Sequence, residues 1–378
     1  MITRLSNKVK SILRGKPEKI VSVYDDSVQK KIINIQKEYL ETDFNNHYYC
    51  DESDFLEEVD NLTFNRVKDN CTKINVFTLN DAFYLHKFGR CIVLQKNKVL
   101  KELSFDGYFE PKQEIVLSIP YFPKKKKIKG KVLCLCTTGA ESNYYTFHLK
   151  LIQRIGFTLK AGFQIDDFDF ILINDSDKKF QNELLEIHGV PKSKVISVKE
   201  GDFFSFEELV VPEVGLQSLI GFDYLREKYQ VNNSSSLERK IYVSRSRAKW
   251  MKIIDEEFLI PVLEKYNIET IFLEDYSVTE QIELFKNVEL FITPHGAGLA
   301  NVVFMKEGSL VLEIMNKNRI HVGYHAYSIL NNLKYAFVRV DSVDNKFSNG
   351  KESTKNLYFS SDDAAKLDDA LAWYYKVR

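Results

Sequence analysis

The fold is restricted first by a regular alternation of strand-like and helix-like segments that runs from Lys131 to about Val340. The alternation comes in two sets, over 131–230 and 237–343, with a polar stretch between them. A pattern of this kind predicts parallel sheets with covering helices, and hence an α/β fold in two halves. Ligands of such folds bind at the carboxyl ends of strands, so residues that directly follow strands are the site candidates.

One strand end carries a motif of two glycines and a histidine. The apolar run Leu290–Ile292 stops at Pro294, and the chain continues as His295-Gly296-Ala297-Gly298-Leu299-Ala300-Asn301. If a helix restarts at Leu299, the turn directs backbone N–H groups, the positive end of the helix dipole and one imidazole toward one point, which suits a diphosphate. The two glycines would let the backbone approach a ligand closely. The alternative is an ordinary strand-to-helix connection with a hydrogen-bonded histidine.

Two further strand-like runs also end in polar side chains. The run Ser309–Met315 carries Glu313 near its end, where a carboxylate could accept both hydroxyls of a ribose. The alternatives for Glu313 are a solvated strand end and a helix N-cap partner. Upstream, the run Lys240–Val243 is followed by hydroxyl and cationic side chains, among them Ser244, Arg245 and Arg247. Guanidinium groups suit phosphate oxygens, and the alternative is a solvated basic loop.

The composition excludes some classes of function. The 53 basic and 53 acidic residues give zero net charge, which argues against nonspecific nucleic-acid binding. With 44% hydrophobic residues, the 378-residue chain can bury one core per half. Five cysteines without metal-ligand spacing favour reduced thiols in a cytoplasmic protein. No bound metal is expected, since Asp175-Ser176-Asp177 suits helix capping, and His321 and His325 lack a third ligand.

The N-terminus carries no sign of a membrane span or a secretion signal. No apolar run approaches the roughly 18 residues of a transmembrane helix, and a signal-peptide core is missing, so a cytoplasmic location is expected. The first 16 residues are basic and amphipathic, a pattern that suits peripheral contact with an anionic membrane at its inner face. The alternative is an ordinary first helix.

The remaining segments suggest domain limits. Residues 1–122 are interpreted as a β-rich N-terminal extension. Two prolines and a run of lysines in Pro120–Lys131 predict a linker. Residues 344–378 are expected to form a polar loop and then a terminal helix, Ser361–Lys376, which opens with a capping signal.

A series of segments follows in fixed order along the second half: Tyr242–Ser246, Asp255-Glu256, Glu280–Ile282 with Leu284-Phe285, Pro294–Asn301, Phe304-Met305 and Leu312–Ile314. This series resembles the family sixty-one glycosyltransferases, which include bacterial capsular polysaccharide transferases and eukaryotic xylosyl- and N-acetylglucosaminyltransferases. The resemblance implies a GT-B architecture, in which two Rossmann-like domains face a cleft. It assigns 131–230 to the acceptor and 237–343 to the donor nucleotide, and a terminal helix in such enzymes often crosses back to the first domain. It also implies inversion at the anomeric carbon without a metal.

The chain departs from this family between residues 143 and 150. Members commonly carry an Asn-Tyr-Tyr-His-Trp-type segment with an aspartate four residues after the histidine, whereas here Thr146 replaces the histidine and Lys150 the aspartate. The general base is therefore open, with Glu141 and His148 as candidates. If this segment is helical, Asn143, Thr146, Lys150 and Arg154 share a cationic face, which is hypothesised to receive an acidic or phosphorylated acceptor.

The sequence thus predicts an inverting glycosyltransferase that moves a sugar from a nucleotide-sugar to a glycan or lipid-linked acceptor, in capsule- or LPS-type polysaccharide biosynthesis. Arg245, His295 and the N–H groups from Gly296 to Leu299 would neutralise the diphosphate, while Ser244 and Asn301 shape the pocket. Two alternatives stay open. One is a noncatalytic nucleotide-sugar-binding scaffold of a polysaccharide assembly complex, and the other is a GT-B-like nucleotide-sugar epimerase.

Overall fold

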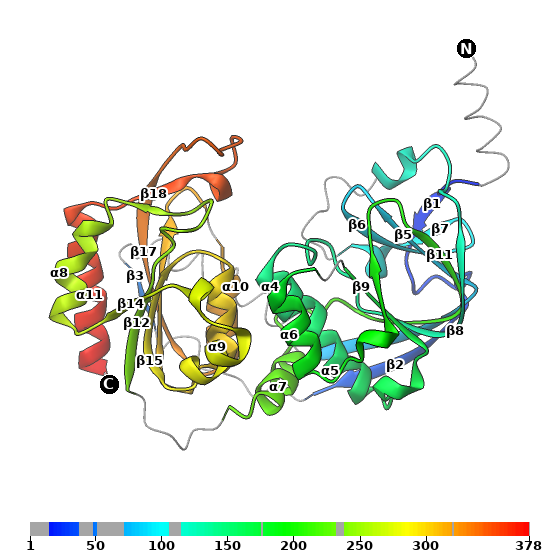
Figure 1. Ribbon diagram of the computed structural model, residues 1–378, viewed down its shortest axis with the longest axis horizontal. Helices are drawn as coiled ribbons and strands as arrows, with labels where there is room; N and C mark the ends of the chain where they lie inside the picture. The colour runs from blue at the N-terminus through cyan, green and yellow to red at the C-terminus, as the bar shows by residue number, and fades with distance from the viewer. Residues whose placement is uncertain are drawn as a thin grey trace, which may run out of the picture. The chain divides into compact units, whose positions relative to one another are not determined.

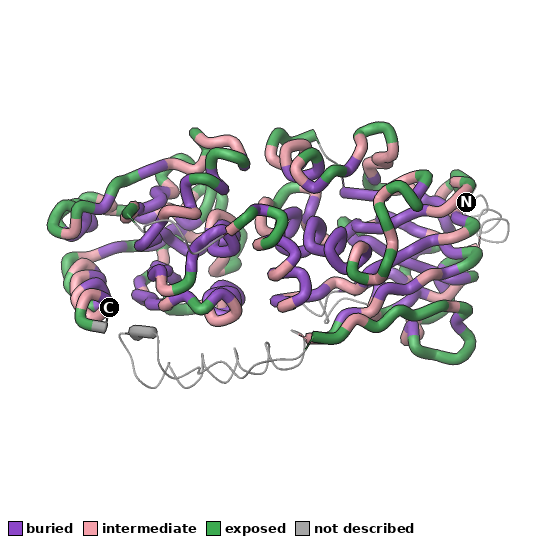
Figure 2. Tube along the Cα trace, turned by 90° about the horizontal axis from the view of Figure 1, so that it is seen from below, coloured by how far each residue is buried: buried purple, intermediate pink, exposed green. Residues whose placement is uncertain are grey.

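The computed structural model describes residues 15–37, 48–50, 72–105, 115–174, 177–231, 238–319 and 321–377. They form two compact units, the first within Met1–Lys37 and Thr72–Gly221, and the second within Glu38–Cys71 and Phe222–Arg378. Each unit contains a sheet with parallel strands and helices, which confirms the predicted α/β class (Figure 1). Buried residues run through the centre of each unit, and most exposed ones lie in the connecting loops (Figure 2).

The first unit is built on a ten-stranded sheet, ordered β1-β7-β6-β5-β11-β8-β9-β10, with β4 beside β11 and β2 beside β4. Its strands are β1 (Lys19–Val21), β2 (Lys30–Gln36), β4 (Lys73–Asn80), β5 (Ala82–Lys87), β6 (Arg90–Gln95), β7 (Lys98–Leu100), β8 (Lys126–Cys134), β9 (Phe170–Asn174), β10 (Val195–Val198) and β11 (Phe203–Pro212). Strands β10, β9, β8 and β11 are parallel, and the chain order reverses between β8 and β11.

The helices of this unit include α3 (Lys101–Ser104), α6 (Lys179–Ile187) and a continuous helical stretch after β8. That stretch consists of α4 (Tyr144–Thr146), the π-helical η2 (Phe147–Ile152) and α5 (Gln153–Lys160). A further helix, α7 (Leu219–Lys228), spans the boundary between the two units.

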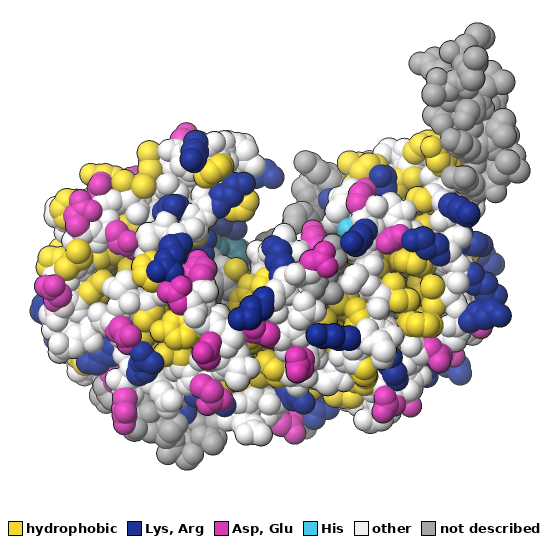
Figure 3. Space-filling view, viewed as in Figure 1, with side chains coloured by type: hydrophobic (Ala, Val, Ile, Leu, Met, Phe, Trp, Pro, Cys, Tyr) yellow, Lys and Arg dark blue, Asp and Glu magenta, His cyan; other side chains and the backbone are white. Residues whose placement is uncertain are grey.

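The lysine-rich segment predicted as a linker is instead part of β8. Basic side chains gather along one edge of the first unit (Figure 3), and three lysines of β8 pair with carboxylates on or beside β11. The pairs are Lys126–Asp202 at 2.8 Å, Lys127–Glu207 at 3.0 Å and Lys131–Glu208 at 3.2 Å. These acidic partners offset the self-repulsion that predicted a linker. Strands β4 and β6, which come from the segment interpreted as a β-rich extension, lie in the same sheet as β8.

The second unit has an eight-stranded sheet, ordered β13-β18-β17-β16-β15-β12-β14, with β3 also paired to β17. Its strands are β3 (Tyr48–Cys50), β12 (Arg239–Val243), β13 (Ile253–Ile254), β14 (Glu269–Ile271), β15 (Val288–Pro294), β16 (Leu310–Asn316), β17 (Lys334–Val343) and β18 (Asn356–Tyr358). Strands β14, β12, β15, β16 and β17 are parallel, so the chain order reverses between β12 and β15. In a doubly wound sheet this reversal marks where ligands bind.

Helices cover both faces of this second sheet. The α-helices are α8 (Ile260–Lys265), α9 (Val278–Phe285), α10 (Gly323–Leu330) and α11 (Ser361–Val377), and the 3₁₀ turns include η5 (Glu256–Leu259), η6 (Leu273–Asp275) and η7 (Ala297–Phe304). Helices α8 and α11 lie on one face, and α9 and α10 on the other (Figure 1). Every residue of β15 and β16 is buried, as expected for central parallel strands covered on both sides.

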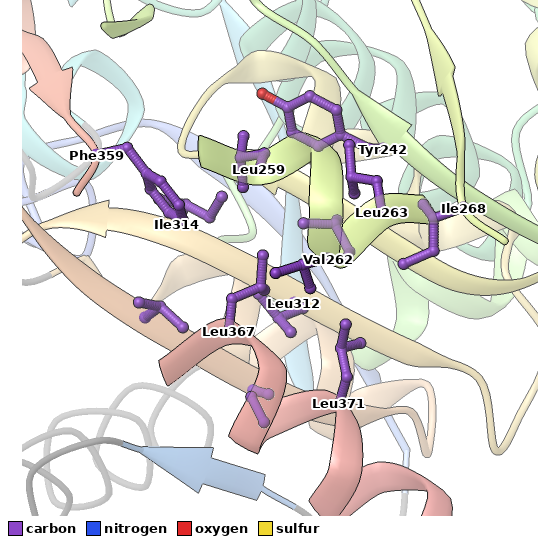
Figure 4. Packing of buried hydrophobic residues seen from close by; sticks show 14 of the residues in the cluster. Tyr242, Leu259, Val262, Leu263, Ile268, Leu312, Ile314, Phe359, Leu367 and Leu371 are labelled. Carbon is purple, nitrogen blue, oxygen red and sulfur yellow. The ribbon is translucent and has the colours of Figure 1, made fainter. Parts of the chain in front are cut away.

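The terminal helix predicted over Ser361–Lys376 is confirmed as α11. The side chain of Ser360 caps its start by bonding with Asp363. Leu367 and Leu371 pack against Leu312 of the sheet and against α8 (Figure 4). The apolar face of this helix is buried in the core of the second unit.

Candidate functional site

Two motifs far apart in the sequence meet at the carboxyl edge of the second sheet. Strand β12 ends at Val243 and β15 at Pro294, and the two strands pair directly. The Thr293 hydroxyl donates to the Val243 carbonyl at 3.1 Å, which ties the two strand ends together. The residues that follow, Arg245 and His295, therefore lie at the reversal of strand order, where a doubly wound sheet binds its ligand.

The Arg245 guanidinium lies against the backbone of Gly296. A Cβ at position 296 would come within 2.2 Å of Nη1, so only glycine leaves room for this side chain. Nη2 of Arg245 donates to the Trp250 carbonyl at 3.0 Å, whereas its buried Nε has no hydrogen-bond partner among the described residues. Burial is the main cause that lowers the pKa of Arg245, yet a guanidinium stays charged at neutral pH. The site thus holds a cation with unused hydrogen-bonding capacity.

His295 is held by a carboxylate from the neighbouring strand. Its Nδ1 bonds to Oε1 of Glu313, and the other oxygen, Oε2, accepts a hydrogen bond from the Tyr335 hydroxyl at 2.6 Å. Because a carboxylate only accepts, Nδ1 carries the hydrogen and Nε2 is the atom left for a ligand. The side chain of Glu313 is 0% exposed and that of His295 is 11% exposed. Glu313 therefore orients His295, and its burial opposes the predicted contact with ribose.

The segment after His295 forms η7, a 3₁₀ helix that begins at Ala297. In such a helix the first two N–H groups, here those of Ala297 and Gly298, have no acceptor within the helix. The N–H of Leu299 already donates to the Gly296 carbonyl at 3.1 Å. Gly298 lies close to another part of the protein and not to an open ligand site, since a Cβ there would lie 2.8 Å from the Leu273 side chain. Two backbone donors thus remain next to the imidazole.

Three other predicted donor-site residues are engaged within the protein. The Ser244 hydroxyl donates to Glu256 at 2.7 Å, and buried Asn301 donates to Gln281 at 2.9 Å. Arg247 is exposed and pairs with Asp275 at 2.6 Å. Ser244 and Asn301 are therefore bonded to neighbouring side chains of the protein, and the charge of Arg247 is paired with a carboxylate.

Two aromatic neighbours of His295 were not among the predicted donor-binding residues, although the position of His321 just after Glu313 pointed to this pocket. The ring of His321 lies 4.6 Å from that of His295, and the ring of Tyr324 lies 5.6 Å from it. His321 and Tyr324 are three residues apart and follow the strand that carries Glu313, and this position in the sequence could have identified them. His325, considered with His321 as a zinc pair, is buried, and its burial lowers its pKa to about 3. No cluster of three metal-ligating side chains occurs within the described ranges.

Three of the four residues on the predicted cationic face, Thr146, Lys150 and Arg154, are buried, and Asn143 is exposed. Asn143 caps the helical stretch by accepting from the Thr146 N–H at 3.0 Å. Arg154 is 1% exposed and Lys150 is 6% exposed. The Arg154 guanidinium donates to the carbonyls of Cys136 and Pro212, which joins the ends of β8 and β11. The π-helical turn of η2 breaks the spacing that placed these residues on one accessible face, so the acceptor contact predicted for them is not supported.

The two candidate bases differ in their access to a substrate. His148 is fully buried, and burial lowers its pKa to about 3, which excludes contact with an acceptor hydroxyl in this conformation. Glu141 lies half-buried in the loop after β8, where its Oε2 accepts from Asn174 at 3.2 Å. Of the two, only Glu141 stands at the carboxyl edge of the first sheet with an accessible side chain.

Fold and site define an α/β protein with a cationic site at the carboxyl edge of a doubly wound sheet. The family model described as glycosyltransferase 61 matches residues 88–312, which is more than half of the chain. The protein belongs to this family, and the family resemblance drawn from the sequence is confirmed. The description of the family model names glycosyltransferases.

A relative supports the same assignment over a shorter stretch. The chain is 31% identical over 81 residues to the EGF domain-specific O-linked N-acetylglucosamine transferase of Drosophila melanogaster. The aligned stretch is 21% of this chain and 15% of that relative, so most of the relative's length lies outside the alignment. Within the described ranges, no helix is both long and apolar enough to span a membrane.

Proposed function

We propose that the protein is an inverting glycosyltransferase whose nucleotide-sugar donor binds at the carboxyl ends of β12 and β15. The observation that carries the proposal is the meeting of Arg245 and His295 at the reversal of strand order. Arg245 lies against the backbone of Gly296, which follows His295 and directly precedes the N–H groups at the start of η7. That combination suits a diphosphate, whose charge must be neutralised as it leaves.

The His295–Glu313 pair supports the electrostatic part of this mechanism. A fully buried carboxylate that accepts from Nδ1 holds the imidazole ring of His295 in place, and it leaves Nε2 for a ligand. A hydrogen bond from Nε2–H to a phosphate oxygen would strengthen as negative charge develops on the leaving group. Arg245 adds a permanent positive charge. In this proposal Arg245 and the imidazole of His295 stabilise the leaving group, and no metal ion is required.

The acceptor side of the proposal is assigned to the first unit. Glu141 is the base in this scheme, because it alone of the two candidates is both at a strand end and accessible. In each unit the parallel strand order reverses once, as in the Rossmann-like halves of a GT-B enzyme. We therefore assign the protein a GT-B architecture, with the donor bound by the second unit and the acceptor by the first.

The biological setting proposed is cell-surface polysaccharide assembly, with a glycan or lipid-linked acceptor. This part rests on the family resemblance. A cytoplasmic location and peripheral contact with an anionic membrane at its inner face belong to the same proposal. The lysines of β8 pair with carboxylates, so the membrane contact is assigned to the basic pattern of the first 16 residues.

A transfer assay tests the proposed function. The protein is incubated with UDP-, GDP- and dTDP-linked sugars and a set of glycan acceptors, and released nucleotide is measured. UDP-N-acetylglucosamine is the first donor, since the name of the Drosophila relative specifies N-acetylglucosamine transfer. NMR of the product should show an inverted anomeric configuration. An epimerised nucleotide-sugar formed without acceptor would contradict the proposal, and binding without turnover by any donor–acceptor pair would favour the scaffold alternative.

A further inference from the structure

We infer that Glu256 is a positioning residue that fixes the turn carrying Arg245. The inference rests on the proposed function for its consequence in nucleotide binding, and on hydrogen bonds in the second unit for its geometry. Glu256 opens η5, which follows the short strand β13 in the chain and lies twelve residues beyond Ser244. Nothing in the proposed mechanism gives this carboxylate a contact with substrate.

One oxygen of Glu256 receives two hydrogen bonds from β12 and its end. Oε1 accepts from the buried Tyr242 hydroxyl and from the Ser244 hydroxyl, the latter at 2.7 Å. The Ser244 oxygen in turn accepts from the Ser246 N–H at 3.1 Å. The result is a chain of bonds that closes around Arg245, the residue between Ser244 and Ser246. Charge-assisted hydrogen bonds of this kind are strong and directional.

The backbone that precedes Glu256 in the chain is consistent with a position of Glu256 that these hydrogen bonds determine. Asp255 adopts φ 61° and Met251 adopts φ 58°, in the left-handed region that residues with a Cβ rarely occupy. Such conformations persist when surrounding contacts determine them, and they gather at functional sites. The segment that delivers Glu256 to Ser244 is therefore held in a conformation that its own sequence does not favour.

Arg245 is held from both directions as a consequence. Its carbonyl accepts from the Ala248 N–H at 2.8 Å, and its Nη2 donates to the Trp250 carbonyl at 3.0 Å. The Glu256 bonds set the start of the same turn. Loss of the carboxylate frees the Ser244 hydroxyl to rotate, and the guanidinium then loses its place against Gly296. Glu256 acts on the ligand only through Arg245.

The first test needs no ligand. Hydrogen–deuterium exchange, read by mass spectrometry over peptides spanning 244–250, reports the Ser246 and Ala248 amides. Glu256→Ala should speed exchange there by about tenfold or more, whereas Glu256→Gln, which keeps an acceptor oxygen, should retain most of the protection. Exposed Glu257 supplies the matched control, and Glu257→Ala should match the wild type. Unchanged exchange in Glu256→Ala would overturn the inference.

The second test is a double-mutant cycle with UDP, GDP and dTDP, measured by isothermal titration. Glu256→Ala should weaken binding of the preferred nucleotide by about tenfold, and the Glu256→Ala/Arg245→Ala double variant should bind no more weakly than Arg245→Ala alone. Effects that multiply would show that Glu256 does not act through Arg245. If the wild type binds none of the three, the proposed function fails, and the exchange measurement still decides the positioning role.

Discussion

The guanidinium of Arg245 lies so close to Gly296 that a Cβ there would come within 2.2 Å of Nη1 and 2.6 Å of Cζ. This contact joins the residues that follow β12 to those that follow β15. The φ of Gly296 is 172°, an extended value open to any residue, so the requirement for glycine is steric. The glycine makes room for a protein cation, whereas the sequence suggested close approach of a ligand.

A Gly296→Ala substitution should displace Arg245 and weaken nucleotide binding about as much as Arg245→Ala does, on the order of tenfold. Titration calorimetry with the preferred nucleoside diphosphate measures the effect. The Gly296→Ala/Arg245→Ala double variant is the control, because it removes the clash, and it should bind no more weakly than Arg245→Ala. Full affinity in Gly296→Ala would show that the contact does not position Arg245.

Glu313→Gln should weaken binding of UDP and of 2′-deoxy-UDP by the same factor. The reason is that Glu313 is buried behind His295, so its charge acts on the imidazole and not on the sugar of the nucleotide. Paired titrations with the two nucleotides measure the factor. A penalty confined to UDP would restore the ribose contact predicted from the sequence and would count against the positioning role.

Removal of the Tyr335 hydroxyl tests whether the hydrogen bond to Glu313 contributes to folding stability without contributing to nucleotide binding. Tyr335→Phe deletes one hydrogen bond to Glu313 but leaves the His295 bond in place. We expect the free energy of unfolding to fall by about 1 kcal/mol, the usual net value of a buried hydrogen bond. Nucleotide affinity should stay within about twofold of the wild type. Urea denaturation and titration, made on the same preparation, decide this prediction.

Arg154→Lys should lower the free energy of unfolding by about 2 kcal/mol, because an ammonium group cannot reproduce the guanidinium fork that bonds to Cys136 and Pro212. Chemical denaturation measures the change. Nucleotide binding in the second unit should not change, which makes it the internal control. A variant as stable as the wild type would show that joining the ends of β8 and β11 is not the role of Arg154.

Stability should fall as the pH falls below about 6.5. Burial lowers the pKa of His148 and of His325 to about 3, so the unfolded chain takes up protons that the folded protein does not. Each histidine should cost about 2 kcal/mol between pH 6.5 and pH 5. His148→Leu should reduce this loss by about that amount in urea denaturation at pH 7.5 and pH 5. An equal pH dependence in wild type and variant would contradict the prediction.

The sequence was sufficient to predict that the two motifs of the proposed donor site meet, because their meeting follows from general rules of parallel sheets. Strand-like runs ending at Val243 and Pro294 had to deliver Arg245 and His295 to one edge. The role of Glu313 could not be predicted, since a carboxylate near a strand end is usually solvated. Its burial depends on Tyr335 and His295, which reach it from the two neighbouring strands.

Two other differences also arise from tertiary structure. The lysine run that enters β8 signals a linker when taken alone, but carboxylates on or beside β11 pair with three of its lysines. The spacing of Asn143, Lys150 and Arg154 assumed a regular α-helix, whereas a π-helical turn lies between them. Neither the remote acidic partners nor the wider turn leaves a local pattern in the sequence.

Titration of the wild type with UDP, GDP, dTDP and CMP, repeated with Arg245→Ala, His295→Ala and Arg247→Ala, tests the donor site most directly. The account predicts that a nucleoside diphosphate binds, and that Arg245→Ala and His295→Ala each weaken it by about tenfold or more. Arg247→Ala should bind like the wild type, because Arg247 is exposed and paired with Asp275. Binding that survives both the Arg245 and the His295 substitution would contradict the account.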